Sequence, residues 1–170
     1  MTDRIRAAVP SDLEPIKEIA VATELFSADD VSMFDELFGG SLNGSLDGHA
    51  WLVLEGEAGA VGGAAYYAPE PFSDRLWNLY FLGVSPDLQG TGGGTDLVDA
   101  VEDELAAMGS ERARILLVET SGLPTFEPTR RFYRGLGFDE EARIRDFYGP
   151  GDDKVVYWKS ILADDQATCH

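Results

Sequence analysis

The spacing of apolar residues changes near residue 50. Before that point two groups recur with a helical period, Leu13, Ile16, Ile19 and Ala20, then Val31, Phe34, Leu37 and Phe38. Ser11 and Glu14 have the spacing of a capping box, and a glycine pair at 39 and 40 is a stop signal. The pattern predicts a helix over about 12–25 and a short second helix that ends at the two glycines.

The middle of the chain is rich in β-formers. Runs at 50–55, 60–68 and 75–84 are separated by the turn-like sequences GEAG and PEPFSD, and a shorter run lies at 4–10. Three adjacent antiparallel strands are the simplest arrangement of the middle runs.

The last third alternates between the two periods. A helix is expected from about residue 92 to Met108, followed by a continuous apolar strand at 114–119 that we expect to be buried on both faces. This strand, helix, strand sequence implies a parallel crossover. Pro128 and Gly137 bracket a further helix, and strands near 140–148 and 154–161 flank the turn GPGDD. The predicted order is β-α-α-β-β-β-α-β-α-β-β.

Length and composition indicate one globular domain, which we place at 1–162 with a disordered tail at 163–170. No apolar run is long enough to span a bilayer and no signal peptide is recognisable, so a cytoplasmic protein without a membrane partner is expected. The single cysteine, Cys169, excludes an intrachain disulfide. With only His49 and His170, no histidine metal site is expected, and His49 is interpreted as structural.

The net charge of −18 is extreme for 170 residues, and the acids are dispersed over every segment. Such a surface repels itself at low salt, whereas molar salt shortens the Debye length to about 3 Å and screens the repulsion. The composition therefore favours a protein from a salt-adapted organism and disfavours nucleic acid as a partner.

A glycine-rich stretch, GVSPDLQGTGGGT at 83–95, joins the end of a predicted strand to the start of a helix. In this geometry backbone N–H groups and the helix dipole converge on an anion. A P-loop would need Gly-Lys-Ser/Thr, and Thr95 occupies the place of the last glycine in G-x-G-x-x-G. What remains is Gln89-x-x-Gly92-x-Gly94.

This motif, with LGVSP before it and FYRGLGF about 40 residues later, resembles the GNAT superfamily of acyl-CoA-dependent N-acyltransferases. The resemblance implies an α/β (α+β) fold with a mixed sheet of about seven strands, splayed to admit acyl-CoA. It also implies that acetyl-CoA is the co-substrate, held by Leu82, Gly83 and Val84 along the strand and by Gln89, Gly90, Thr91, Gly92, Gly93, Gly94 and Thr95 at the pyrophosphate. Many members carry Arg or Lys in this loop; here binding would rest on backbone donors.

For catalysis, the resemblance implies that Tyr133, in RRFYRGLGF, is the general acid beside the sulfur. The family also commonly has Asn and Ala ahead of this Phe-Tyr pair, and this chain has Phe126 and Thr129 there instead. Glu119 ends the buried run RILLVE, where α/β sheets present groups to ligands, and is the candidate base; a solvated rim glutamate is the alternative. Without a nucleophilic cysteine, direct attack is favoured over a covalent intermediate.

The acceptor side is less constrained by the sequence. Tyr80 and Asn78 lie on the strand beside the expected cleft, and the polar hairpin RDFYGPGDDK offers Asp146, Tyr148, Asp152 and Asp153 for a cationic amine. The same hairpin is also good turn chemistry. The helices at 12–40 usually form the other wall of the site in this family, although Phe26, Phe34 and Phe38 fit a core better.

The leading hypothesis is an N-acetyltransferase that acts on a small-molecule amine or a peptide N-terminus, without a metal; homodimers are common in the family. Two alternatives remain open at this point. One is a CoA-binding sensory module without turnover. The other is a nucleotide-phosphate binder, against which the absence of the P-loop lysine argues.

Overall fold

The computed structural model describes residues 4–161, so Cys169, His170 and the proposed tail lie outside the described part. Within it, seven strands and four α-helices follow one another in the predicted order: β1 Ile5–Ala7, α1 Leu13–Ala22, α2 Met33–Asn43, β2 Ala50–Glu55, β3 Val61–Pro69, β4 Leu76–Val84, α3 Gly93–Met108, β5 Ile115–Ser121, α4 Glu127–Gly135, β6 Asp139–Gly149 and β7 Asp152–Ser160. The strands form a mixed sheet in the order β1-β2-β3-β4-β5-β7-β6.

The chain divides into two compact units. Unit 1 contains Met1–Ala68 and Tyr80–Glu104, and unit 2 contains Pro69–Leu79 and Leu105–His170. Strand β4 contributes to both, because the division falls between Leu79 and Tyr80.

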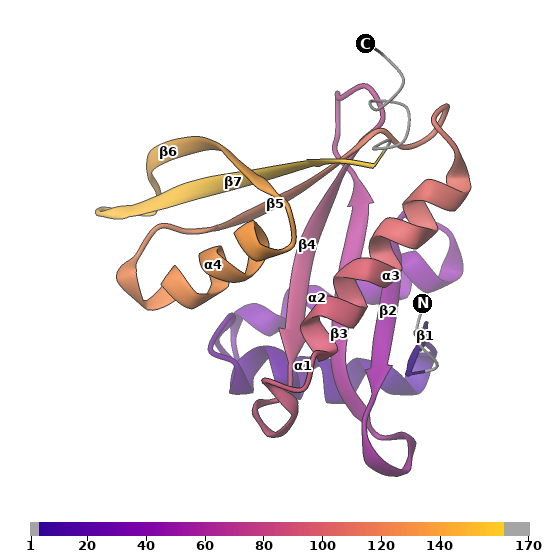
Figure 1. Ribbon diagram of the computed structural model, residues 1–170. Coiled ribbons are helices and arrows are strands. Elements are labelled where there is room, and N and C mark those ends of the chain that lie inside the picture. The colour runs from indigo at the N-terminus through magenta and orange to yellow at the C-terminus, as the bar shows by residue number, and fades with distance from the viewer. Residues whose placement is uncertain (1–3, 162–170) are drawn as a thin grey trace. The chain divides into compact units, whose positions relative to one another are not determined.

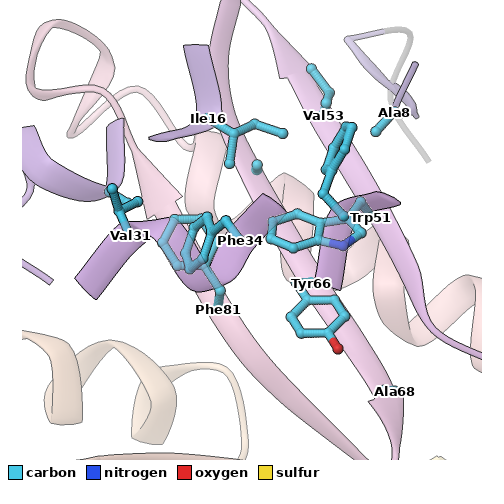
Figure 2. Close-up of a cluster of buried hydrophobic side chains, with 12 residues drawn as sticks. Ala8, Ile16, Val31, Phe34, Trp51, Val53, Tyr66, Ala68 and Phe81 are labelled. Carbon is cyan, nitrogen blue, oxygen red and sulfur yellow. The ribbon is translucent and has the colours of Figure 1, made fainter. Parts of the chain in front are cut away.

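Unit 1 is built on strand β2, whose four central residues are buried. Figure 1 shows α1 and α2 on one face of β2 and β3, with α3 across the opposite face. Because side chains alternate along a strand, Trp51 and Val53 join a core with residues from α1 and α2 (Figure 2). Leu54 faces the start of α3, since a Cβ placed on Gly93 would lie 2.5 Å from its Cδ2. Burial on both faces explains the continuous apolar run AWLVLE.

The aromatic residues of α2 belong to this core, as expected. Phe34 and Phe38 are each 2% exposed and pack edge-on against Trp51 at centroid distances of 5.5 and 5.4 Å. Phe26 is partly buried against the same cluster. They stabilise the fold through buried apolar area and edge-to-face contacts.

Two helix ends differ from the sequence-based prediction. Helix α1 ends at Ala22 and not near residue 25. Helix α2 does not stop at Gly39 and Gly40 but continues to Asn43 and ends at Gly44, whose φ of +82° provides the left-handed cap. Leu46 packs where a Cβ on Gly40 would be, so that glycine serves a close contact inside the helix.

The predicted capping box at Ser11 and Glu14 does not form. The carboxylate of Asp12 instead accepts the N–H of Val9 at 2.8 Å and two hydrogen bonds from Arg6 at 2.8 and 3.0 Å. The tertiary contact with the arginine outweighs the local capping pattern, because a charge-assisted bidentate bond is stronger than a neutral cap.

Unit 2 contains the parallel pairing of β4 with β5, from Leu76 opposite Ile115 to Leu79 opposite Val118. This confirms the predicted crossover. Strands β5 and β7 pair antiparallel, as do β6 and β7. Strand β5 is not buried on both faces as its apolar run suggested: buried residues alternate with partly exposed ones.

Candidate active site

The turn between β4 and α3 has the open backbone that its glycines predicted. Gly90 and Gly92 have φ values of +83° and +88°, a left-handed conformation that costs other residues about 1–2 kcal/mol. Nothing lies within 4 Å of where a Cβ on either glycine would be. The need for glycine here is therefore conformational, and the space beside the turn stays free of side chains.

The first turn of α3 offers backbone donors that have no partner within residues 4–161. The first amide of this turn that binds within it is that of Asp96, which donates to the carbonyl of Gly92 at 3.0 Å. The amides of Gly93, Gly94 and Thr95 come earlier and make no backbone hydrogen bond to another residue in the part of the chain that the structure describes. Together with the helix dipole they form a favourable position for an anion.

Short hydrogen bonds hold the loop in shape. The Gln89 side chain donates to the carbonyl of Val84 at 3.1 Å, and the Thr91 hydroxyl donates to the carbonyl of Leu88 at 2.6 Å. Both side chains are thus used by the loop itself. This leaves the backbone as the main source of donors toward a ligand.

One charged pair adjoins these donors. Arg4, whose backbone carbonyl accepts the N–H of Glu55, places Nη2 2.6 Å from Oδ2 of Asp96 in the first turn of α3. The two residues are 92 positions apart. No sequence pattern signalled this contact.

Tyr80 in β4 is 43% exposed, and its ring lies 5.8 Å from that of Tyr66. Tyr66 in turn stacks on Trp51 and shares a short hydrogen bond with Nδ1 of His49. Burial lowers the pKa of His49. His49 is therefore hydrogen-bonded into the aromatic row, and Tyr80 is the exposed end of that row.

Tyr133 lies in α4 of unit 2 and is only 5% exposed. Its ring contacts those of Phe132, Phe138 and Tyr157 at centroid distances of 5.2 to 5.9 Å. Burial raises the pKa of Tyr133, and its hydroxyl makes no hydrogen bond to any other residue of the described range 4–161. The hydroxyl is therefore available to a ligand, while the ring is held by its aromatic neighbours.

Glu119 is held at both of its carboxylate oxygens. Oε1 lies 2.8 Å from Nζ of Lys154, and Oε2 accepts from Nδ2 of Asn78 at 3.1 Å. The same Asn78 nitrogen donates to Oε2 of Glu70 at 3.0 Å, and Asn78 is 1% exposed. The orientation of Glu119 is thus fixed by an amide and an ammonium group, which a freely solvated rim residue would lack.

The β6–β7 hairpin contributes a second carboxylate and an aromatic side chain near Glu119. Burial and the negative charges of Glu119 and Asp152 raise the pKa of Tyr148 to about 12. Asp152 accepts a short hydrogen bond from Ser121, while the ammonium of Lys154 lies 3.6 Å from the ring centroid of Phe147. Glu119, Tyr148 and Asp152 therefore lie in one electrostatic neighbourhood.

The other two hairpin acids have structural partners. Asp146 has a φ of +57° and accepts the N–H of Gly151, and its own amide donates to Asp153. Asp153 also binds Arg143 at 3.0 Å. These bonds explain the turn chemistry of GPGDD and leave less of either carboxylate for a ligand.

Several residues of these groups were not predicted as site members. Arg4, Glu70 and Lys154 reach these groups because neighbouring strands pair in a particular register or because distant segments come into contact. The scarcity of lysine, three in 170 residues, was the one signal in the sequence that could have drawn attention to Lys154.

The described residues hold neither an arranged metal-binding group nor a membrane-spanning helix. Among residues 4–161 no group of three or more His, Cys, Asp or Glu side chains is arranged to hold a metal ion. No helix in the same range has both the length and the apolar character needed to cross a membrane.

Comparison with known proteins identifies the family. A sequence model described as the acetyltransferase (GNAT) family matches residues 14–138. No curated protein matches the chain.

Solved structures support the fold. A protein of Desulfovibrio desulfuricans assigned to GNAT acetyltransferases has a TM-score of 0.84 and 29% identity, covering 93% of this chain and 98% of its own. The phosphinothricin acetyltransferase of Sinorhizobium meliloti, solved with AcCoA, has a TM-score of 0.72 and 21% identity. The match covers 94% of this chain and 89% of that one. An aminoglycoside 6'-N-acetyltransferase solved with coenzyme A has a TM-score of 0.73 and 16% identity. The match covers 93% of this chain and 97% of that one. The chain belongs to the GNAT family of acetyltransferases.

Proposed function

We propose that this protein is an N-acetyltransferase that moves the acetyl group of acetyl-CoA to a primary amine by direct attack. The observation that carries the proposal is the set of backbone donors at Gly93, Gly94 and Thr95 that have no partner among residues 4–161, preceded by a left-handed glycine turn. It is supported by the family match and by two similar structures that contain CoA or AcCoA.

The cofactor-binding residues of the proposal all belong to unit 1. The loop and helix start from Gly90 to Thr95 surround the pyrophosphate, which accepts from the amides of Gly93, Gly94 and Thr95, and the main chain of Leu82, Gly83 and Val84 holds the pantetheine arm. Gln89 and Thr91 keep the turn in its binding conformation through the bonds described above. Acetyl-CoA supplies an activated thioester carbonyl to this site.

Glu119 accepts the proton that the acceptor amine must lose before its nitrogen lone pair can attack the carbonyl carbon. The proton passes directly or through one water. Asn78 and Lys154 keep the carboxylate oriented for this transfer. The amine nitrogen forms a bond to the acetyl carbon while the carbon–sulfur bond breaks, and the electron pair leaves with sulfur. The nitrogen, positively charged after attack, releases its second proton to solvent and becomes the neutral amide.

Tyr133 donates its hydroxyl proton to the departing thiolate and regains a proton from solvent. Its raised pKa keeps the phenol protonated at neutral pH, and its hydroxyl has no competing partner in the described part of the chain. Transfer is thereby completed without a covalent enzyme intermediate.

For the acceptor we propose a small-molecule amine or a peptide N-terminus, contacted by Tyr80, Tyr148 and Asp146. The carboxylates of Glu119 and Asp152 near Tyr148 favour a positively charged amine. We further propose a cytoplasmic enzyme; a homodimer and salt adaptation stay predictions.

The first test is binding. Millimolar acetyl-CoA should raise the melting temperature of the protein at high salt, because a ligand that binds only the folded state stabilises it. An unchanged melting temperature would contradict the proposal at its first step.

The second test is turnover. A panel of amines is incubated with acetyl-CoA and enzyme, and released thiol is followed together with the mass of the acetylated product. Binding without thiol release across diamines, amino acids, aminoglycosides and peptides would instead support a CoA-binding module.

A further inference from the structure

A carboxylate stands in the first turn of α3, beside the donors that the proposed function assigns to pyrophosphate. Asp96 follows Thr95 directly, and helix geometry keeps it within about 10 Å of the amides that precede it. A negative charge there stabilises the helix alone but repels a polyanionic ligand at the same end. Within the loop from Ser85 to Thr95 no Lys or Arg offsets it.

Arg4 supplies the missing positive charge from another part of unit 1. Its Nη2 lies 2.6 Å from Oδ2 of Asp96, with the two side chains 40% and 21% exposed. Its backbone is fixed because the N–H of Glu55, at the end of β2, donates to its carbonyl at 2.8 Å. The arginine is therefore held where it faces the first turn of α3.

We propose that Arg4 is a positioning residue for cofactor binding, which neutralises Asp96 so that the backbone N–H groups of α3 can donate to the CoA phosphates. The inference rests on the proposed function. It answers the electrostatic problem of a chain with net charge −18 that binds a polyanion without a cation in its loop. Arg4 acts through Asp96 and not by touching the phosphates.

Four variants separate this role from direct contact. Their local charge at the Arg4–Asp96 pair is zero in the wild type, −1 in Arg4→Gln, +1 in Asp96→Asn and zero in the double variant. Charge compensation predicts that CoA affinity rises with this local charge. Asp96→Asn should bind CoA most tightly and Arg4→Gln most weakly. The double variant should return to within about twofold of the wild type.

The measurement is CoA dissociation by calorimetry at about 20 mM and about 500 mM salt. At low salt Arg4→Gln should weaken binding about threefold to tenfold, and most of this difference should vanish at high salt. The matched control is Arg75→Gln: Arg75 also pairs with an aspartate, has the same 40% side-chain exposure and lies in unit 2. It removes one positive charge from the protein and should leave CoA affinity unchanged.

The possible failures are distinguishable. A wild type that does not bind CoA would overturn the proposed function and this inference with it. If the wild type binds and Arg4→Gln binds equally well at low salt, the inference alone is wrong. A double variant as weak as Arg4→Gln would also overturn it, since the arginine would then act on the ligand itself. Asp96→Asn tests the idea independently of any folding defect in Arg4→Gln.

Discussion

The loop after β4 and the polar group around Glu119 differ in which atoms face a ligand. The loop presents backbone amides, and the group around Glu119 presents side chains. In the loop, Gly92 removes the side chain and leaves backbone amides, while the polar side chains of Gln89 and Thr91 bind the loop itself. Around Glu119, the side chains of Asn78 and Lys154 hold a carboxylate in place. Backbone donors suit any phosphate at a helix start, whereas oriented side chains suit one reaction.

This contrast predicts that side-chain changes in unit 2 affect turnover, and backbone changes in the loop affect cofactor affinity. The largest effect is expected for Tyr133→Phe, which removes the proton donor while leaving the ring packing. Turnover should fall about 100-fold with little change in the Michaelis constant for acetyl-CoA. The measurement is steady-state thiol release.

Tyr157→Phe is the matched control for this prediction. Tyr157 is fully buried with its ring 5.9 Å from that of Tyr133, but its hydroxyl already binds Arg134 and Glu140. It should lose stability and keep its turnover. Equal turnover losses in both variants would show that the core tolerates no missing hydroxyl and would remove Tyr133 from the mechanism.

Glu119→Gln should have the next largest effect, lowering turnover about tenfold because the amide cannot accept the amine proton. Its shape is conserved, so CoA binding should persist. Glu140→Gln, which removes a carboxylate that binds Tyr157, is the control and should leave the rate unchanged. A Glu119→Gln variant with the wild-type rate at every pH would show that solvent, and not Glu119, accepts the proton of the acceptor amine.

In the loop, Gly92→Ala should weaken CoA binding about tenfold, because a left-handed φ of +88° is strained by about 1–2 kcal/mol with a Cβ. Calorimetry of CoA measures the change. Gly44→Ala has the same kind of strain, with a φ of +82° and equally open space, at the end of α2. It should lower the melting temperature without weakening CoA, and a matching loss of affinity would mean that general destabilisation explains both.

The smallest effect on activity is expected at Asp12, which belongs to neither region. The guanidinium of Arg6 holds the pKa of Asp12 below its ordinary value, so the folded chain binds fewer protons there than the unfolded chain. This stabilisation is present above the unfolded pKa of about 3.9 and is lost as pH falls through the lower folded pKa.

Asp12→Asn should therefore be less stable than the wild type at pH 7, by about 1–3 kcal/mol, and the difference should shrink toward pH 2. Thermal unfolding across that range measures it. A difference that stays constant down to pH 2 would show that the carboxylate charge is not what stabilises this contact.

Much of the fold follows from local patterns. The boundaries of β2 and the start of α3 near Gly92 agree closely with the predictions, because alternation, helical period and glycine turns act over a few residues. The capping error at the start of α1 and the boundary error at the end of α2 have one cause. Asp12 and Gly40 make contacts with side chains that a local pattern does not include.

The residues of the candidate site were predicted unevenly for the same reason. The glycines at Gly92 and its neighbours predict the backbone conformation of the turn, because a left-handed turn at a helix start needs glycine. Tyr133 was found through a family motif, and the structure added that the residue is largely buried and that its hydroxyl has no hydrogen-bond partner within residues 4–161.

The sequence by itself determined which segments are strands and helices, that a glycine loop lies between a strand and a helix, and which family the motifs resemble. Only the tertiary structure decided that Asn78 reaches Glu119 across 41 positions and that Arg4 meets Asp96 across 92. The physical reason is the distance along the chain over which each interaction acts. Backbone preferences act between near neighbours, whereas charge pairing depends on which strands adjoin, in which register, and on what a buried carboxylate finds opposite it.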